Sequence, residues 1–189
     1  MAGDKIIMGW SKCKIEIGKT PEEETMATDL TSVGTIKDKS STLEPGDGDV
    51  LEAKATGGVT VAKEEQEGTL TLKTRVIEPT NALLSLLNLG EAAEQDDFDV
   101  KTHIVDVPFS VKVTPKNVGA IGIKAAKTNV SYKPGWSEEE GNYADLTFEI
   151  VMPSTGKWYT RFKSKGITTL SAPDGQAVAV APAKTTAAK

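Results

Sequence analysis

The residues that could do chemistry in this chain are few and lie far apart. There is one histidine, His103, and one cysteine, Cys13, so a Ser-His-Asp or Cys-His device would need His103 as its base. His103 lies beside Asp99 and Asp106 at strand or loop spacing, whereas a metal site needs several converging N, O or S ligands. We therefore interpret His103 as a half-exposed strand histidine and expect no metal site.

The phosphate-binding motif is present only in part. Gly18-Lys19-Thr20 matches the last three residues of a P-loop, but the position five before Gly18 holds Cys13, where the motif needs glycine. Cys13 alternates with isoleucines, which favours a buried, apolar role for its thiol. We expect that the protein is not an enzyme and that it uses no cofactor.

Acidic side chains gather in four runs, at residues 22–24, 64–67, 96–99 and 138–140. Paired carboxylates can serve as acid and base, but any acidic protein offers such runs in its solvated loops. We interpret the four runs as exposed loops.

The overall charge is mildly acidic. Twenty-two Lys and Arg stand against 27 Asp and Glu, which gives a net charge of -5. This balance argues against sequence-reading nucleic-acid binding, which relies on a basic face. Solubility alone explains it, and the more specific interpretation is a surface that repels DNA passing nearby.

The length limits the number of domains, and the cysteine content indicates the redox compartment. A chain of 189 residues suits one all-β domain with additions, or two small ones. A single cysteine forms no internal disulfide, which suits a reducing compartment. No run of about 18 apolar residues predicts a membrane span, and residues 1–10 lack an apolar stretch of signal-peptide length. We expect a protein that is made in the cytoplasm and does not associate with membranes.

Two-residue alternation of apolar and polar side chains dominates the chain and predicts strands. The expected strands are residues 13–17, 31–36, 51–56, 59–67, 70–76, 105–113, 118–125, 146–152 and 158–162. Gly57-Gly58 is expected to turn a long hairpin, and the last two strands are expected to pair as another. Pro108 indicates a sheet edge or a bulge. Residues 37–49 and 126–142 are expected to be long loops.

One short helix is predicted at residues 81–89. Pro79-Thr80 would open it and Gly90 would close it. Its leucines fall on one arc of the helix, which must dock on the sheet because so short a helix is marginal alone. The packing residues are Leu83, Leu84, Leu86 and Leu87.

These elements predict a mainly β fold: an antiparallel β-sandwich or barrel with one short packed α-helix and long loops. Residues 1–170 would form the single domain, and residues 171–189 a C-terminal extension rich in Ala, Pro and Thr. Alone in solution such an extension should be mobile.

The order of the elements resembles that of phage major tail tube proteins and of the tube subunits of contractile injection systems. The resemblance rests on residues 33–90, where a strand ends in Gly34-Thr35-Ile36 and a Ser/Thr-rich loop follows. That loop carries Pro45-Gly46-Asp47-Gly48-Asp49, and the strand set at 51–76 and the leucine helix come next. The predicted hairpin at 148–162 is compatible with the same pattern. The extension after Ser171 is not part of it.

The resemblance implies a structural virion protein of the phage tail. Six subunits would form a hexameric ring by joining their sheets into a shared inner β-barrel, and stacked rings would form the tail tube through which DNA passes. Its partners would be its own copies and other tail proteins, with transient, non-specific passage of DNA. The loops at 37–49 and 131–142 would make ring-to-ring contacts.

Charged strand residues are the candidates for lumen or inter-subunit contacts, with an ordinary solvent face as the competing interpretation. They are Lys54, Lys63, Glu65, Glu67, Lys73 and Arg75.

Three other functions fit the sequence. The first is a virion decoration or host-binding β-sandwich protein, which would remain monomeric and would expose an aromatic cluster. A small enzyme with unconventional residues is the second, disfavoured by the single histidine and the incomplete motifs. The third is a β-rich adhesin or pilin-like subunit, disfavoured by the missing export signal.

Overall fold

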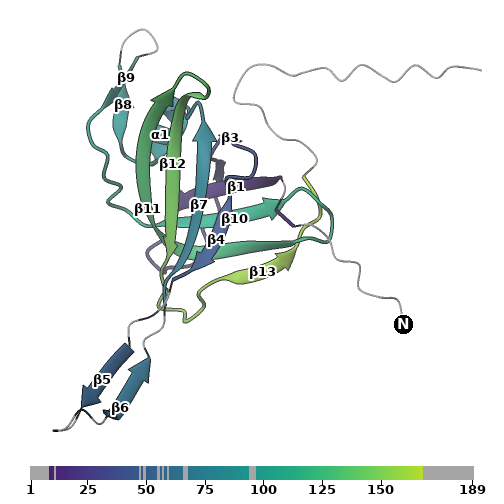
Figure 1. The fold of residues 1–189 in the computed structure, drawn as a ribbon. Coiled ribbons are helices and arrows are strands. Elements are labelled where there is room, and N and C mark those ends of the chain that lie inside the picture. Colours follow the sequence, from purple (N-terminus) through teal and green to yellow (C-terminus); the bar gives the residue numbers. More distant parts are fainter. Residues whose placement is uncertain are drawn as a thin grey trace, which may run out of the picture.

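The computed structural model describes residues 9–10, 12–46, 48, 50–54, 56, 58, 60–65, 68–93 and 97–167. Glu67 and the extension at 171–189 lie outside the described residues, and so does the side chain of Glu65. The described chain is mainly β, with a curled antiparallel sheet and one short helix, which confirms the predicted fold class (Figure 1).

In the described part of the chain, the strands follow one another with one helix among them. They are β1 (Cys13–Lys19), β2 (Thr31–Ser32), β3 (Thr35–Ile36), β4 (Thr42–Pro45), β5 (Val50–Lys54), β6 (Thr60–Glu65), β7 (Leu70–Ile77), β8 (Gly90–Ala92), β9 (Phe98–Val100), β10 (Phe109–Pro115), β11 (Ile121–Ser137), β12 (Gly141–Ile150) and β13 (Thr160–Lys163). The helix is α1 (Asn81–Leu86).

The main sheet bends at β11, the longest strand, so that it forms two layers. The first part of β11 pairs with β10 and β13, and β10 pairs in turn with β1. The second part, from Thr128 to Ser137, pairs with β12, which pairs with β7. Strands β3 and β4 line the far side of β7. Figure 1 shows the strands of the two layers crossing steeply.

The core lies between these layers because each strand turns one side inward. Ile15 and Ile17 of β1 meet Leu72 of β7 and Phe148 of β12 in one cluster of buried side chains. Alternation along β1 and β7 predicts this arrangement, and the burial pattern of both strands follows it.

Helix α1 packs its leucines onto that core. Leu83, Leu84 and Leu87 are buried, and Leu86 is half-buried against the same cluster. The hydroxyl of Thr80 accepts a hydrogen bond from the Leu83 N–H, which satisfies an N–H at the start of the helix.

The helix is shorter than predicted, because it ends at Leu86 rather than at residue 89. Asn88 has a φ of 57° and supplies the left-handed residue that follows the helix end, a role expected of Gly90. Gly90 instead begins β8, where a Cβ would lie 1.9 Å from the carbonyl oxygen of Asp99.

The predicted loop at 126–142 is wrong. Strand β11 continues to Ser137, and its buried Val130 and Tyr132 anchor it to the core. Pro134 argued against a strand here, because proline lacks the N–H that a central strand needs. Proline is tolerated where only one side of the strand is paired. The predicted loop at 37–49 likewise contains β4, and the predicted strand at 31–36 is divided into β2 and β3 around Gly34.

The predicted hairpin of residues 146–152 and 158–162 is also wrong. Strand β13 pairs with the first part of β11, with Gly122 opposite Phe162. Strand β12 is already paired on both sides, by β11 and β7, so it has no edge left for β13. The strand expected at 105–113 begins only at Phe109, after Pro108.

Strands β5 and β6 form the expected hairpin, with Ala53 opposite Ala62. It extends away from the main sheet in Figure 1. Among the described residues, no helix is both long enough and apolar enough to cross a membrane.

Candidate functional site

One layer of the sheet has a polar side that faces away from the core. We call this surface, on β4, β7, β12 and the second part of β11, the polar face. On β7 the inward side chains are Leu72 and Val76, so Lys73 and Arg75 point outward. On β12 the same alternation turns Asp145 and Thr147 outward. Nothing in the described part of the chain forms a further layer over this face.

The strand register arranges the outward side chains in rows. Lys133 of β11 lies opposite Asp145 of β12, which lies opposite Arg75 of β7. Ser131, Thr147 and Lys73 form the next row. Opposite charges directly across a strand pair stabilise a sheet, and the first row alternates in sign.

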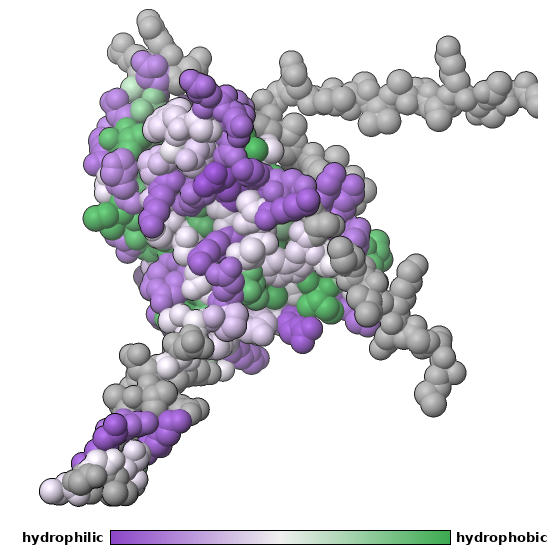
Figure 2. All heavy atoms as spheres, viewed as in Figure 1, coloured by the Kyte–Doolittle hydropathy of each residue, from purple (hydrophilic) through white to green (hydrophobic). Residues whose placement is uncertain are grey.

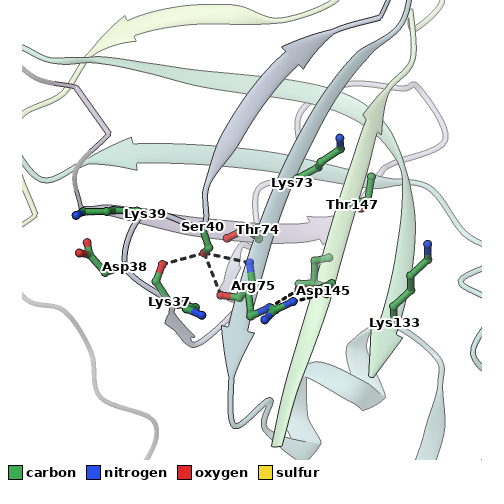
Figure 3. A pocket seen from close by; sticks show the side chains of 11 residues that line it. Lys37, Asp38, Lys39, Ser40, Lys73, Thr74, Arg75, Lys133, Asp145 and Thr147 are labelled. Carbon is green, nitrogen blue, oxygen red and sulfur yellow. Dashed lines mark hydrogen bonds and ion pairs between the residues drawn. The ribbon is translucent and has the colours of Figure 1, made fainter. Parts of the chain in front are cut away.

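An open depression of about 490 Å³ lies over this part of the polar face (Figure 3). Its lining includes cations and two carboxylates, together with the hydroxyls of Ser40 and Thr147. The charged residues are Lys37, Asp38, Lys39, Lys73, Arg75, Lys133 and Asp145.

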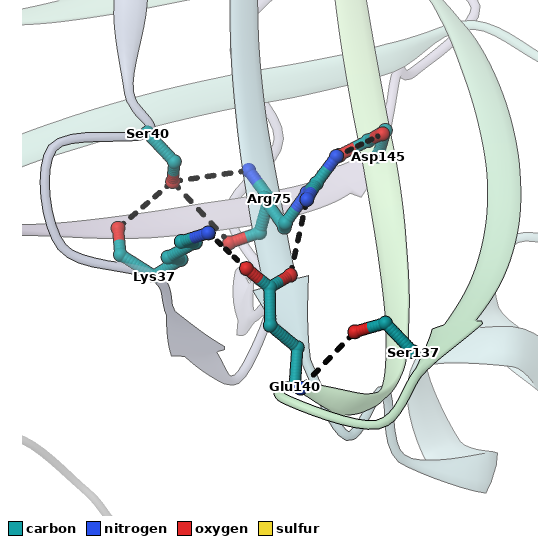
Figure 4. Close-up of polar contacts among 6 residues, drawn as sticks. All are labelled: Lys37, Ser40, Arg75, Ser137, Glu140 and Asp145. Atoms are coloured by element: carbon teal, nitrogen blue, oxygen red, sulfur yellow. Dashed lines mark hydrogen bonds and ion pairs between the residues drawn. The ribbon is translucent and has the colours of Figure 1, made fainter.

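Arg75 is the centre of an ion-pair network at one side of the depression (Figure 4). Its guanidinium donates to both carboxylate oxygens of Asp145 and, through Nη1, to Glu140 at 3.0 Å. Glu140 also pairs with Lys37. The guanidinium lies 4.2 Å from the centroid of the Tyr143 ring, which adds a cation–π contact.

The network holds three separate chain segments together. Glu140 lies in the β11–β12 turn, Arg75 in β7 and Lys37 just after β3. The hydrogen bond from Lys37, and then the one from Arg75, lowers the pKa of Glu140 below that of an ordinary glutamate. The hydrogen bonds that Arg75 donates to Asp145 raise the pKa of Arg75 above its ordinary value. Together these ion pairs hold the three segments in place, and we call this network of Lys37, Arg75, Glu140 and Asp145 the clamp.

The candidate lumen residues fall into two groups. Lys73 and Arg75 lie on the polar face, where Lys73 pairs with Glu44 of β4 at 2.8 Å. Lys54 and Lys63 lie on the β5–β6 hairpin, where Glu52 is opposite Lys63 in the register. Strands β5 and β6 pair only with each other in the described chain, so the structure does not bring the two groups into one site.

Sequence reasoning missed Lys37, Lys133, Glu140 and Asp145. Asp145 could have been found, because it alternates with the buried Ala144 and Leu146. Glu140 was interpreted as part of a solvated acidic run, and nothing in its neighbourhood along the chain points to Arg75, 65 residues away.

Within the described residues, both margins of this layer have backbone groups with no neighbouring strand. On the side of β11 away from β12, the only pairing within the described residues past Thr128 is a single bridge from Ile104 to Ser131. Beside this open margin, Ile104 and Trp136 are 74% and 73% exposed. At the opposite margin, β7 is the one strand that pairs with β4 in the described part of the chain.

The residues singled out for chemistry remain apart. His103 is exposed in a bend just before the Ile104 bridge, rather than within a strand. Cys13 is buried, as its alternation predicts, and burial raises the pKa of its thiol. The described residues contain no group of three His, Cys, Asp or Glu side chains that could hold a metal ion.

No protein-family model matches the sequence, and a search of curated proteins gives no match.

Proposed function

We propose that this chain is a structural subunit that assembles with its own copies into rings, and that stacked rings form a tail tube with the polar face lining the channel. The observation that carries the proposal is that one layer of the sheet has both an uncovered polar face and two open strand margins. An open sheet margin is an aggregation hazard in a monomer, and a closed ring removes it by pairing each margin with the next copy.

Strand direction supports such a ring. The neighbouring pairs β11–β12, β12–β7 and β7–β4 are all antiparallel. With four strands in the layer, β11 and β4 run in opposite directions. Rotation about an axis along the strands keeps these directions, so β11 of one copy would meet β4 of the next as an antiparallel pair. The alternation then continues around the whole ring.

The size of such a barrel supports a channel. Barrels of about 16–18 strands already enclose an aqueous channel. Six copies with four strands each would exceed that number, so the inward-facing side chains would be wet. A wet interior favours polar side chains, and Arg75, Lys73 and Thr147 are of this kind.

The pairing of part of the positive charge on the polar face supports passage of DNA without tight binding. Non-specific DNA affinity comes from cations that neutralise phosphates. Arg75 and Lys73 are already paired with carboxylates of the same chain, which lowers their attraction for a passing phosphate.

The test is the size of the purified protein and the effect of one substitution at the open margin. Sedimentation velocity and negative-stain images of the wild type are expected to show rings or tubes. Trp136→Glu adds a charge beside the open margin of β11 and is expected to keep the fold while reducing assembly at least tenfold. Met152→Glu is the matched control, because Met152 is an exposed apolar residue beyond the other end of β12.

Particles of about 20 kDa at all concentrations would overturn the proposal, and would favour a monomeric decoration or host-binding role. Equal assembly of Trp136→Glu and wild type would show that the margin of β11 is not the joint.

A further inference from the structure

Two surfaces of this fold carry opposite net charges. The acidic end comprises the exposed Glu78, Asp97, Asp99, Glu138 and Glu139. Glu78 is tied to the β11–β12 turn through its N–H, which donates to the Asn142 carbonyl at 2.8 Å. Figure 1 places the β8–β9 hairpin, which includes Asp99, at the same end.

The acidic end has few cations that could neutralise it. Lys101 pairs with Glu91 at 2.6 Å, and Lys37 pairs with Glu140. Glu138 and Glu139 have no ion pair among the described residues. This end therefore carries a net negative charge.

The second surface is basic and lies on the other layer of the sheet. It comprises Lys12, Lys14, Lys112, Lys116 and Lys124, and we call it the lysine face. The strand register aligns Lys112 of β10 with Lys124 of β11, and the Lys116 N–H donates to the Lys12 carbonyl at 2.8 Å. These side chains point outward because their strand neighbours Ile15, Val113 and Ile123 fill the core.

One carboxylate, Glu16, lies among these five lysines, at 2.9 Å from Lys14 and 3.5 Å from Lys112. Lys124 instead lies 5.1 Å from the centroid of the Phe162 ring. The lysine face is therefore positively charged in a protein whose net charge is -5. Such segregation is unexpected for a surface that serves solubility alone, since interspersed charges suffice there.

The two surfaces lie toward opposite ends of the β11–β12 hairpin. The acidic turn connects Ser137 to Gly141, whereas the layer with the lysine face joins β11 at Thr128, opposite Ile150. In a ring whose strands follow the axis, the acidic end would form one rim and the lysine layer would lie toward the other.

We propose that successive rings meet head to tail, with the acidic end of each copy docked on the lysine face of a copy in the next ring. This inference rests on the proposed function. Contact between two like surfaces would bring equal charges together, so the charge pattern favours unlike surfaces. A contact between unlike surfaces that does not close repeats without limit, and such repetition builds a filament.

The experiment is a charge exchange between two variants. The first, Lys116→Glu with Lys124→Glu, makes the lysine face acidic. The second, Glu138→Lys with Glu139→Lys, makes the acidic end basic. Each variant alone is expected to form at least tenfold fewer tubes than wild type, and an equal mixture is expected to restore tubes, because the altered surfaces then complement each other.

Glu22→Lys with Glu23→Lys is the control, since it adds the same charge at two exposed carboxylates in the loop between β1 and β2. Control tubes equal to wild type show that the loss is local. Wild-type tubes should also shorten with added salt, which screens charges beyond about 10 Å at 0.1 M.

Three results would overturn the inference. If wild type forms tubes and both variants do so equally, the two surfaces are not in contact, although the proposed ring would stand. If the mixture stays as poor as its components, the surfaces do not face each other. If the lysine substitutions abolish binding of duplex DNA and leave the tubes unchanged, the lysine face serves phosphates. Wild type that forms no rings would refute the proposed function itself.

Discussion

Arg75 on β7 and Asp145 on β12 face each other as a bidentate pair, with Nε donating to Oδ1 at 2.7 Å and Nη2 donating to Oδ2 at 2.9 Å. The two residues are direct partners in the strand register. A guanidinium presents two parallel N–H groups that match a carboxylate, a geometry that lysine cannot reproduce. The pair therefore depends on the shape of the side chains as well as on their charges.

Replacing this arginine by lysine should weaken the clamp although the charge is kept. Arg75→Lys is expected to lower the urea midpoint, because one ammonium cannot hold Asp145 and Glu140 together. In the Arg75→Lys background, Asp145→Asn should cost less than it does in wild type, and a double-mutant cycle measures this coupling. Lys133→Ala, which removes a charge from the same row, is the control substitution. If the stability losses of Arg75→Lys and Asp145→Asn simply added in the double variant, the prediction would be contradicted.

Acid should destabilise the protein through Glu24. The ammonium of Lys127, and then the Ser154 N–H at 2.6 Å, lowers the pKa of Glu24 from its ordinary value of 4.5 to about 2. A carboxyl whose pKa is depressed on folding stabilises the fold above its unfolded pKa, and this stability is lost as pH falls from about 4.5 toward about 2.

The measurement is the free energy of unfolding at pH 7 and at pH 3 for wild type and for Glu24→Gln. The variant should be less stable at pH 7 and should lose less stability on acidification than wild type. Glu22→Gln, at an exposed carboxylate two residues earlier, should follow wild type at both pH values. If Glu24→Gln also followed wild type, this ion pair would not contribute to acid sensitivity.

The helix should depend on its buried leucines. Leu87 is 0% exposed, so Leu87→Ala should lower the free energy of unfolding by about 2–5 kcal/mol through lost burial and a cavity. Leu86→Ala makes the same change at a half-buried neighbour and should cost clearly less. Leu83→Asp should prevent folding, because an unpaired charge would be buried. Unchanged thermal melts for all three variants would mean that the helix is not docked.

Gly18 should tolerate no side chain. A Cβ at this position would lie 2.2 Å from the carbonyl oxygen of Asp29, where the segment after the first acidic loop passes over β1. Gly18→Ala should therefore cost about 1–3 kcal/mol, the usual range for overpacking. Gly9→Ala, where nothing lies within 4 Å, should be neutral in the same urea titration. Equal stability of the two variants would contradict the close approach.

Elements with a clear pattern of apolar residues were predicted from the sequence alone. Alternation of Cys13, Ile15 and Ile17 predicted β1, and the leucines after Thr80 predicted a docked helix. The period of a strand is a property of consecutive residues, so one sequence suffices to find it. The end of the helix was misplaced because Asn88 adopts the positive φ that was expected of Gly90.

Which strands pair, and which charges meet, was decided only by the tertiary structure. Strand β13 pairs with β11 because β12 is paired on both sides by β11 and β7. Pro134 is accommodated in β11 because no strand of the described chain pairs with it on the side away from β12. Glu140 reaches Arg75 across 65 residues of sequence through this pairing. A strand can pair only with a strand edge that no other strand occupies. Which edges are unoccupied depends on the whole fold, so it cannot be derived from consecutive residues.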